Sequence, residues 1–295
     1  MMMTRLWNLL INTFIVVKII ETPRDGFQGL PNFIPTDVKI EYINLLLKCG
    51  FNTVEVGSFV SPKAIPQMAD TAKVMDGIDF GNTKSDIAVL TASKKGGAMA
   101  MEYEQINQIF FPFAVSPTFL KKNINQTLEQ AEATIDELQN MCIIHNKELI
   151  VFFSMGFGSA YGDDWSIELL LYWIRRMKAK GLNIFPFSDI LGGATPESIS
   201  KVFANLITEF SNTEFGLHLH SLKHQRMEKV DAAYQAGVRM FDTVVNGLGG
   251  CPQTGKELVG NLPLGDFLDY CDQNSIHVKL NEGYLKKANE FPINF

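Results

Sequence analysis

Eight apolar runs rich in β-forming residues recur along the chain, with amphipathic stretches between them, and this alternation constrains the fold most. The runs lie at residues 15–21, 52–58, 85–92, 106–113, 148–158, 182–190, 214–220 and 239–247. In the stretches 36–50, 125–146, 166–181 and 225–237, apolar residues recur at three- and four-residue spacing, which predicts helices. Strands that alternate with helices in this way indicate an α/β fold with a parallel sheet.

Eight such units without a long linker predict a single (β/α)8 TIM barrel, and a chain of 295 residues has the usual length for one. A doubly wound open sheet is the alternative. It is disfavoured because the glycine-rich dinucleotide fingerprint is missing after the first strand. We expect residues 1–13 to be an N-terminal extension and residues 14–295 to form the catalytic barrel domain.

The N-terminal segment Met1–Val17 is fairly apolar, but it lacks the small-residue cleavage site of a signal peptide. A membrane span needs about 20 apolar residues, and Asn8, Asn12 and Lys18 interrupt this run. We therefore interpret the segment as a short extension and expect no membrane partner. A signal anchor is the less favoured alternative.

Charge and cysteine content narrow the function and the compartment. The net charge of −6 argues against a general nucleic-acid binder, because no basic excess is available to neutralise phosphates. The four cysteines, Cys49, Cys142, Cys251 and Cys271, form neither a C-x-x-C motif nor a disulfide framework. A reducing, cytoplasmic location is the simplest interpretation.

His218 and His220 occur in the run E-F-G-L-H-L-H, which is predicted to be a strand. Residues i and i+2 of a strand point to the same side, so the two imidazoles would converge on a divalent metal. Polar residues also lie at the ends of other predicted strands: Arg24 and Asp25 just after the first, Glu55 and Ser58 at the second, and Asp189 at the sixth. Active sites of such barrels form at the C-terminal ends of the strands, where these residues would lie.

Five motifs together resemble the 3-hydroxy-3-methylglutaryl-CoA lyase family, which belongs to a superfamily of metal-dependent lyases and Claisen-type barrel enzymes. They are I-I-E-T-P-R-D-G-F-Q at 19–28, E-V-G-S-F-V-S-P-K-A-I-P-Q-M-A-D at 55–70, H-L-H at 218–220, N-G-L-G-G-C-P at 246–252 and G-N-L at 260–262. The R-D and H-x-H elements are shared across the superfamily. S-F-V-S-P-K and G-L-G-G-C-P are specific to the lyase branch.

The resemblance implies cleavage of (S)-3-hydroxy-3-methylglutaryl-CoA to acetyl-CoA and acetoacetate, a step of leucine degradation and ketone-body metabolism, by a homodimer. Three alternatives stay open: a lyase for a related 3-hydroxyacyl-CoA, a Claisen-type condensing enzyme, and a metal-binding scaffold without catalysis. The presence of both Arg24 and Cys251 argues against the scaffold. Ser221 follows H-L-H where the family commonly has an acidic residue.

The metal ligands implied by the resemblance are Asp25, His218, His220 and Asn261. One carboxylate, two imidazoles and an amide oxygen, completed by water and substrate, suit Mg²⁺ or Mn²⁺. Each residue outside the histidine pair also has a purely structural explanation. Asp25 could be a turn residue in R-D-G, and Asn261 could cap a helix.

The resemblance also assigns the acid and the electrophile of the reaction. Arg24 would stabilise the enolate left by bond cleavage, because a guanidinium carries charge without losing its proton. Cys251, in the loop Gly-Gly-Cys-Pro, would deliver a proton to that enolate. For Arg24 the alternative is an ordinary surface ion pair, and for Cys251 it is a buried structural thiol.

Several residues are candidates for the general base and for the contacts to the substrate. The resemblance implies Asp25 and a metal-linked histidine as the candidate bases, with Glu55 and Asp189 assisting them. Gln28 would contact the substrate carboxylate. The lysines Lys63, Lys121 and Lys122 are candidates for the CoA phosphates, with solvated surface positions as the alternative.

Overall fold

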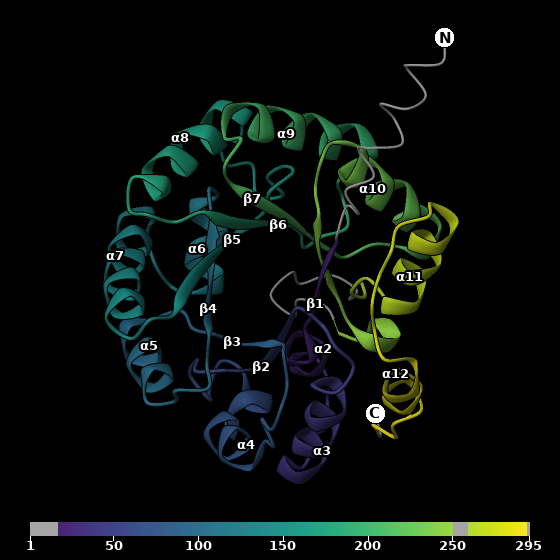
Figure 1. The fold of residues 1–295 in the computed structure, drawn as a ribbon. Coiled ribbons are helices and arrows are strands. Elements are labelled where there is room, and N and C mark those ends of the chain that lie inside the picture. The colour runs from purple at the N-terminus through teal and green to yellow at the C-terminus, as the bar shows by residue number, and fades with distance from the viewer. Residues whose placement is uncertain (1–16, 250–258, 294–295) are drawn as a thin grey trace.

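A computed structural model of the chain describes residues 17–249 and 259–293. In this part of the chain eight parallel strands close into a barrel in the order β1 to β8, with β8 paired to β1 (Figure 1). This confirms the single barrel and excludes the open sheet. The strands are β1 (Lys18–Glu21), β2 (Thr53–Ser58), β3 (Asp86–Leu90), β4 (Gln108–Ala114), β5 (Glu148–Ser154), β6 (Ile184–Asp189), β7 (Glu214–Leu219) and β8 (Met240–Thr243).

Most of the described helices form a ring outside the barrel (Figure 1). They are α3 (Thr36–Leu46), α4 (Thr71–Gly77), α5 (Lys94–Met101), α7 (Leu128–Ile144), α8 (Ile167–Lys178), α9 (Pro196–Glu209), α10 (Lys223–Gln235), α11 (Leu264–Gln273) and α12 (Glu282–Asn289). Two short helices follow strands directly, α2 (Pro23–Gln28) after β1 and α6 (Pro117–Asn123) after β4. Two 3₁₀ turns, η1 (Pro66–Met68) and η2 (Val245–Gly247), complete the described elements.

The predicted elements are confirmed, but two of the predicted strands run too far. In the run 148–158 the observed strand ends at Ser154. In the run 239–247 the observed strand ends at Thr243, and the 3₁₀ turn η2 follows it. Met155 has a φ of 58°, which takes the chain out of the extended conformation. An apolar run does not by itself reveal such a turn, because strand and loop residues are equally apolar here.

The N-terminal extension expected at residues 1–13 lies outside the described residues, as do residues 14–16 at the predicted start of the barrel domain. Over residues 17–249 and 259–293, no helix is both long and apolar enough to cross a bilayer.

Phenylalanines dominate the layer between the strands and the helices. Phe153 stacks on Phe187 with ring centroids 4.9 Å apart, and Phe187 packs edge-on against Phe203 of α9. A second, smaller apolar cluster lies inside the barrel, around Ile20, Ala88, Phe110, Ile150 and Met240. The apolar contacts that fix the barrel therefore lie mainly on its outer side, and polar side chains are free to occupy the interior at one end.

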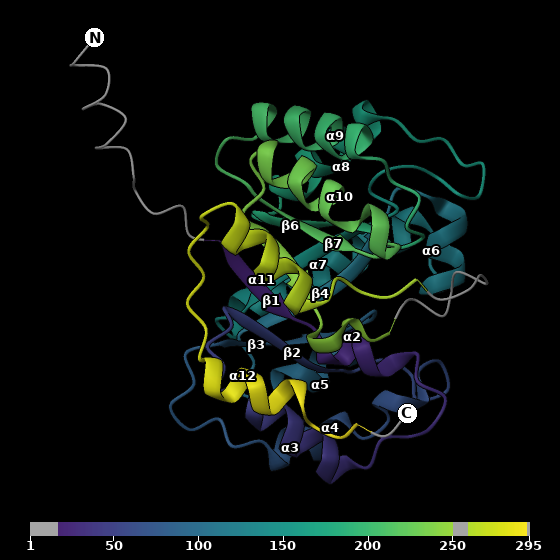
Figure 2. The same ribbon diagram turned by 90° about the vertical axis from the view of Figure 1, so that its right-hand side faces the viewer.

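The parallel arrangement brings the C-terminal ends of all eight strands to one face of the barrel, seen edge-on in Figure 2. On this face, Ser188 of β6 pairs in register with His218 of β7. A register shift between Glu55 and Gly57 marks a bulge in β2. Bulges re-aim side chains next to active sites, and this one lies beside Glu55.

Candidate metal and catalytic site

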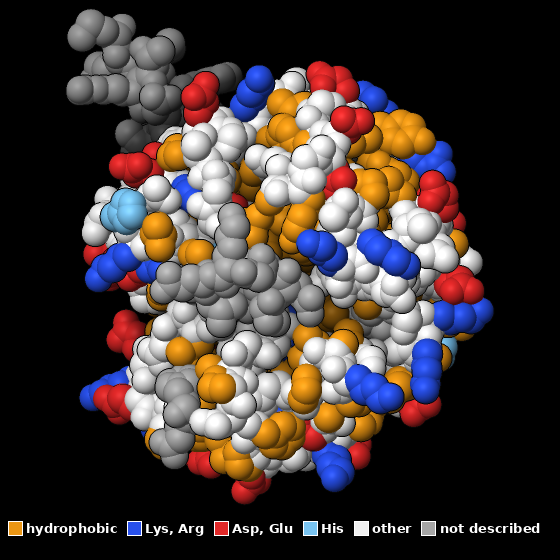
Figure 3. All heavy atoms as spheres, turned by 180° about the vertical axis from the view of Figure 1, so that it is seen from behind, with side chains coloured by type: hydrophobic (Ala, Val, Ile, Leu, Met, Phe, Trp, Pro, Cys, Tyr) orange, Lys and Arg blue, Asp and Glu red, His pale blue; other side chains and the backbone are white. Residues whose placement is uncertain are grey.

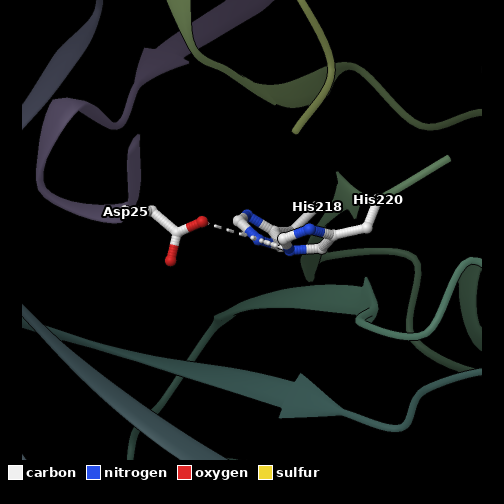
Figure 4. A group of neighbouring side chains, drawn as sticks. All are labelled: Asp25, His218 and His220. Carbon is white, nitrogen blue, oxygen red and sulfur yellow. Dashed lines mark hydrogen bonds and ion pairs between the residues drawn. The ribbon is translucent and has the colours of Figure 1, made fainter. Parts of the chain in front are cut away.

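Asp25, His218 and His220 form a buried group whose ligand atoms all lie within 4.8 Å of one another (Figure 4). Asp25 belongs to the first turn of α2, directly after β1, and His218 belongs to β7. His220 lies one residue beyond the end of β7, where it forms an isolated antiparallel bridge with Asn261. The predicted convergence of the two imidazoles is confirmed, although the strand ends before the second of them.

The two imidazoles face each other through their Nε2 atoms, which are 3.0 Å apart. His218 Nδ1 lies 2.9 Å from the Asp242 carboxylate, and His220 Nδ1 lies 3.0 Å from the Val259 carbonyl. Both of these partners accept hydrogen bonds, so each Nδ1 carries a proton and donates it. Two Nε2 lone pairs at this distance repel each other unless a cation, either a proton or a metal ion, lies between them.

Two members of the group, His220 and Asp25, have the ionisation that metal ligands require. Burial alone would lower the pKa of the third, His218, but its hydrogen bond to Asp242 and the charges of Asp242 and Asp25 outweigh burial and raise that pKa. Burial, followed by the charge of His218, lowers the pKa of His220 to about 4, so this ring is neutral near pH 7. Burial alone would raise the pKa of Asp25, but Arg24 and the two histidines outweigh it and lower that pKa. A carboxylate and a neutral imidazole are the forms that bind metals.

Asp25 also has an unsatisfied oxygen that points toward the histidines. Its Oδ2 atom is buried, has no hydrogen-bond partner among the described residues, and lies 3.9 Å from His218 Nε2. A buried carboxylate oxygen without a partner is costly. A divalent cation held between Asp25 and the two imidazoles would satisfy it, so the residues present fit a metal.

Asn261 lies beside this group, as the resemblance implies. Its Nδ2 atom donates to the Leu248 carbonyl at 2.8 Å, and its side chain also hydrogen-bonds to Asp25, which helps to lower the pKa of that carboxyl. It does not cap a helix, because α11 begins at Leu264 and its cap position is Pro263. The structural explanation for Asn261 is therefore wrong, and all four expected ligands meet at one place.

Arg24 lies in the same cluster, held by three side chains. Its Nε and one terminal nitrogen both donate to Glu55 Oε1 at 2.8 Å, and its other terminal nitrogen donates to Asp25 and to Gln28. Gln28 in turn donates to Asp25 Oδ1 at 2.6 Å. Burial raises the pKa of Glu55 to about 7, although Arg24 opposes this shift. Arg24 is therefore no surface ion pair; its guanidinium has a fixed orientation.

Asp189, expected to assist the base, instead directs its carboxylate to other partners. Its Oδ2 atom accepts hydrogen bonds from the ammonium of Lys229 and from the backbone N–H of Ala194, both at 3.1 Å. The described residues that line the nearby cavity include Ser188 and Ile190, on either side of Asp189, but not Asp189 itself.

A cavity of about 470 Å³ opens above Arg24 and the metal group. Apolar side chains line part of its wall, and the hydroxyls of three buried serines, Ser58, Ser154 and Ser188, also border it. Lys122 lies at its edge, 4.5 Å from the centre of the Tyr161 ring. Of the three candidate lysines, all of them exposed, only Lys122 is among the described residues that line the cavity.

Cys251 lies outside the described residues, but the segment that leads to it contacts the site. Gly249 has a φ of 86°, and a Cβ atom there would lie 2.5 Å from the Asp25 carbonyl oxygen. Only glycine fits this backbone conformation and this close approach. Figure 3 shows this face of the molecule, with Lys and Arg side chains at several places around it.

Two contributors to the site were not anticipated from the sequence, Asp242 and the Val259 carbonyl. Both fix the orientation and tautomer of a histidine through its Nδ1 atom. Asp242 could have been suspected, because it is the one charged residue in the apolar strand β8. Val259 carries no such signal, because its contribution is a backbone atom.

Comparisons with known proteins identify a family and several relatives that the chain resembles. A family model described as HMGL-like matches residues 16–291. The mitochondrial hydroxymethylglutaryl-CoA lyase of Bos taurus is 32% identical over 93% of this chain and 84% of its own. The solved structure of the Bacillus subtilis HMG-CoA lyase has a TM-score of 0.87 at 29% identity, covering 94% and 92%. An HMG-CoA lyase from Acinetobacter baumannii, solved with coenzyme A and 3-methylmalate, has a TM-score of 0.86 at 27% identity, covering 94% and 90%.

Proposed function

Because the chain belongs to the HMGL-like family, we propose that it is a metal-dependent carbon–carbon lyase that cleaves (S)-3-hydroxy-3-methylglutaryl-CoA. The products are acetyl-CoA and acetoacetate, as in leucine degradation and ketone-body metabolism. The observation that carries the proposal is the meeting of Asp25, His218 and His220 with the fixed guanidinium of Arg24 at one cavity.

Asp25, His218, His220 and Asn261 would hold Mg²⁺ or Mn²⁺. The set has oxygen and imidazole donors and no thiolate, which suits these ions better than zinc. When bound, the ion supplies Lewis acidity toward the hydroxyl and carboxyl oxygens of the substrate.

Arg24 is the electrophilic catalyst of the reaction, the cationic group that stabilises the enolate. Removal of the C3 hydroxyl proton and cleavage of the C2–C3 bond release acetoacetate and leave the enolate of acetyl-CoA. The guanidinium stabilises the negative charge that develops on this fragment, and Glu55 keeps its orientation fixed, so little reorganisation is needed. Gln28, bonded to both Arg24 and Asp25, borders the cavity and contacts the substrate carboxylate.

Two proton transfers complete the reaction. The acceptor of the hydroxyl proton belongs to the group of Asp25 and the two histidines, which lies at the cavity. Cys251 donates the proton to C2 of the enolate, which yields acetyl-CoA. Asp189 has a positioning role instead of an acid–base one, because Lys229 and a backbone N–H occupy its carboxylate.

Lys122 is the best placed of the lysines to meet the CoA phosphates, because it lies at the edge of the cavity. We further propose that the protein acts as a homodimer in the cytoplasm, where four cysteines without disulfide spacing stay reduced. Light scattering of the purified protein would give its mass in solution, and a monomer would contradict the dimer.

The direct test is an assay of purified protein with Mn²⁺ and the named thioester. We expect acetoacetate and acetyl-CoA in equal amounts, with activity lost in EDTA and restored by added Mn²⁺. The variant Asp25→Asn serves as the matched inactive protein. If acetoacetate is absent while another 3-hydroxyacyl-CoA is cleaved, the substrate assignment is wrong. If only condensation of acetyl-CoA with a keto acid is seen, the reaction class is wrong.

A further inference from the structure

Lys229 of α10 is a buried cation that the reaction does not use. Its side chain is 1% exposed, and its ammonium donates to Asp189 Oδ2 at 3.1 Å and to the Gly192 carbonyl at 2.8 Å. Burying an ammonium is expensive unless charged and polar partners surround it. A lysine held in this way suggests that the pair has a purpose beyond solubility or packing.

The Lys229 ammonium closes the turn that follows β6. Asp189 Oδ2 also accepts from the Ala194 backbone N–H at 3.1 Å, and the Gly192 N–H donates to the Asp189 carbonyl at 3.3 Å. Lys229 therefore contacts both the start and the middle of the turn 189–194. Without the ammonium, the Gly192 carbonyl would lose this hydrogen bond and the Asp189 carboxylate would lose its countercharge.

This turn packs directly on the metal group. The Asp189 carbonyl accepts the backbone N–H of His220 at 3.2 Å. Gly192 has a φ of 68°, and a Cβ atom there would lie 3.2 Å from the His220 carbonyl and 3.4 Å from Val259 Cγ1. Val259 is also the residue whose carbonyl orients the His220 imidazole. The turn thus contacts His220 and the residue that fixes its ring.

We propose that Lys229 is a positioning residue for the metal site. It holds the turn 189–194 against His220 and Val259, and so keeps His220 Nε2 aimed at the ion. This inference rests on the metal site proposed above. Partners that orient a metal ligand typically contribute about 10–100-fold to metal affinity, and we expect an effect of this size from Lys229 although it touches no ligand side chain.

The experiment is isothermal titration of Mn²⁺ into the wild type and Lys229→Met, with Lys39→Met as the matched control. Lys39 is also buried, and it also bonds an aspartate, Asp70 at 2.7 Å, and a backbone carbonyl, that of Gln67. We expect both substitutions to lower the melting temperature. Lys229→Met alone should weaken Mn²⁺ binding, by about tenfold or more. Equal weakening in both variants would assign the effect to general stability and overturn the proposal.

A double variant, Lys229→Met with Asp189→Leu, keeps the proposal testable if the single variant does not fold. It replaces the ion pair by an apolar pair, a change that is often neutral for stability. We expect a folded protein in which Mn²⁺ binding stays weak, because the bonds to Gly192 and Ala194 are gone. Wild-type affinity in either variant would overturn the role of Lys229. Failure of the wild type itself to bind Mn²⁺ would instead refute the metal site.

Discussion

The Nε2 atoms of His218 and His220 face each other at 3.0 Å, while the Nδ1 atom of His218 donates to Asp242 and that of His220 donates to Val259. The outer partners set the tautomers, and the tautomers leave both Nε2 lone pairs directed at the same point. A metal ion placed there also reaches the unsatisfied Oδ2 atom of Asp25. The properties of the site therefore depend on residues that do not themselves bind the ion.

The substitution Asp242→Asn tests this dependence. Asparagine keeps the shape of Asp242 but presents no charge to His218 and can donate as well as accept. We expect Mn²⁺ affinity, measured by titration calorimetry, to fall by about 10–100-fold. Asp86→Asn is the control, because Asp86 lies at the N-terminal end of β3, at the opposite end of the barrel. Unchanged affinity in Asp242→Asn would mean that the carboxylate does not orient the histidine.

The substitution Arg24→Lys should separate catalysis from metal binding. Lysine keeps the charge but cannot donate through two nitrogens to Glu55, so the charge loses its fixed place beside the cavity. At saturating Mn²⁺ we expect kcat for thioester cleavage to fall by about 10²–10³-fold. Arg176→Lys, in the exposed ion pair with Glu132, is the control and should turn over normally. A change in KM alone would assign Arg24 to substrate binding.

The substitution Cys251→Ser should lower turnover by orders of magnitude. A serine hydroxyl is a far weaker acid than a thiol, so it transfers its proton poorly to the enolate. Mn²⁺ affinity should be retained, because the expected ligands do not include Cys251. Cys271→Ala is the control, since this thiol is buried in the core of the protein. Turnover close to the wild-type value would remove Cys251 from the mechanism.

The raised pKa of Glu21 leads us to expect that the free energy of unfolding falls as pH rises. Burial raises its pKa to about 8 in the fold, from 4.5, although bonds from the Val245 N–H and the Thr243 hydroxyl oppose the shift. Between these two values the folded protein binds more protons than the unfolded chain, so stability is lost with increasing pH. The loss amounts to at most about 5 kcal/mol.

Glu21→Gln should remove this pH dependence. The amide oxygen can accept from Val245, and the amide nitrogen can donate to the Thr243 hydroxyl, as a neutral carboxyl would. Urea unfolding at pH 5 and pH 8 should show a gain relative to the wild type that is larger at pH 8. Glu137→Gln, at an exposed surface ion pair with Lys94, is the control for a carboxylate without burial. An equal effect at both pH values would show that Glu21 is ionised throughout.

Much of the fold could be predicted because its signals are local. The apolar runs and the amphipathic stretches between them each depend on neighbouring residues, and their alternation has few solutions other than a barrel. The ends of the strands and helices were harder to predict. Strands β5 and β8 stop earlier than their apolar runs, because Met155 and the turn η2 leave the extended conformation within apolar sequence.

The site could be predicted where a residue type carries its own chemistry. His218, His220, Asp25 and Arg24 have side chains that suit metal binding or charge stabilisation, and their motifs place them at strand ends. Asp189 has an equally suitable side chain, yet its carboxylate bonds to Lys229. Whether a carboxylate faces a cavity or a lysine depends on a helix 40 residues away in sequence, which no local pattern reports.

The sequence alone therefore predicted the barrel and the H-x-H pair, because periodicity and side-chain chemistry are properties of short segments, while the set of four candidate ligands came from the family resemblance of its motifs. Only the tertiary structure decided which nitrogen of each imidazole faces the ion, how Glu55 holds Arg24, and that Lys229 supports the turn beside His220. Closure of the barrel brings His218 of β7 within hydrogen-bond distance of Asp242 of β8 and places Asp25, which follows β1, beside them. These contacts between distant segments fix tautomers and orientations.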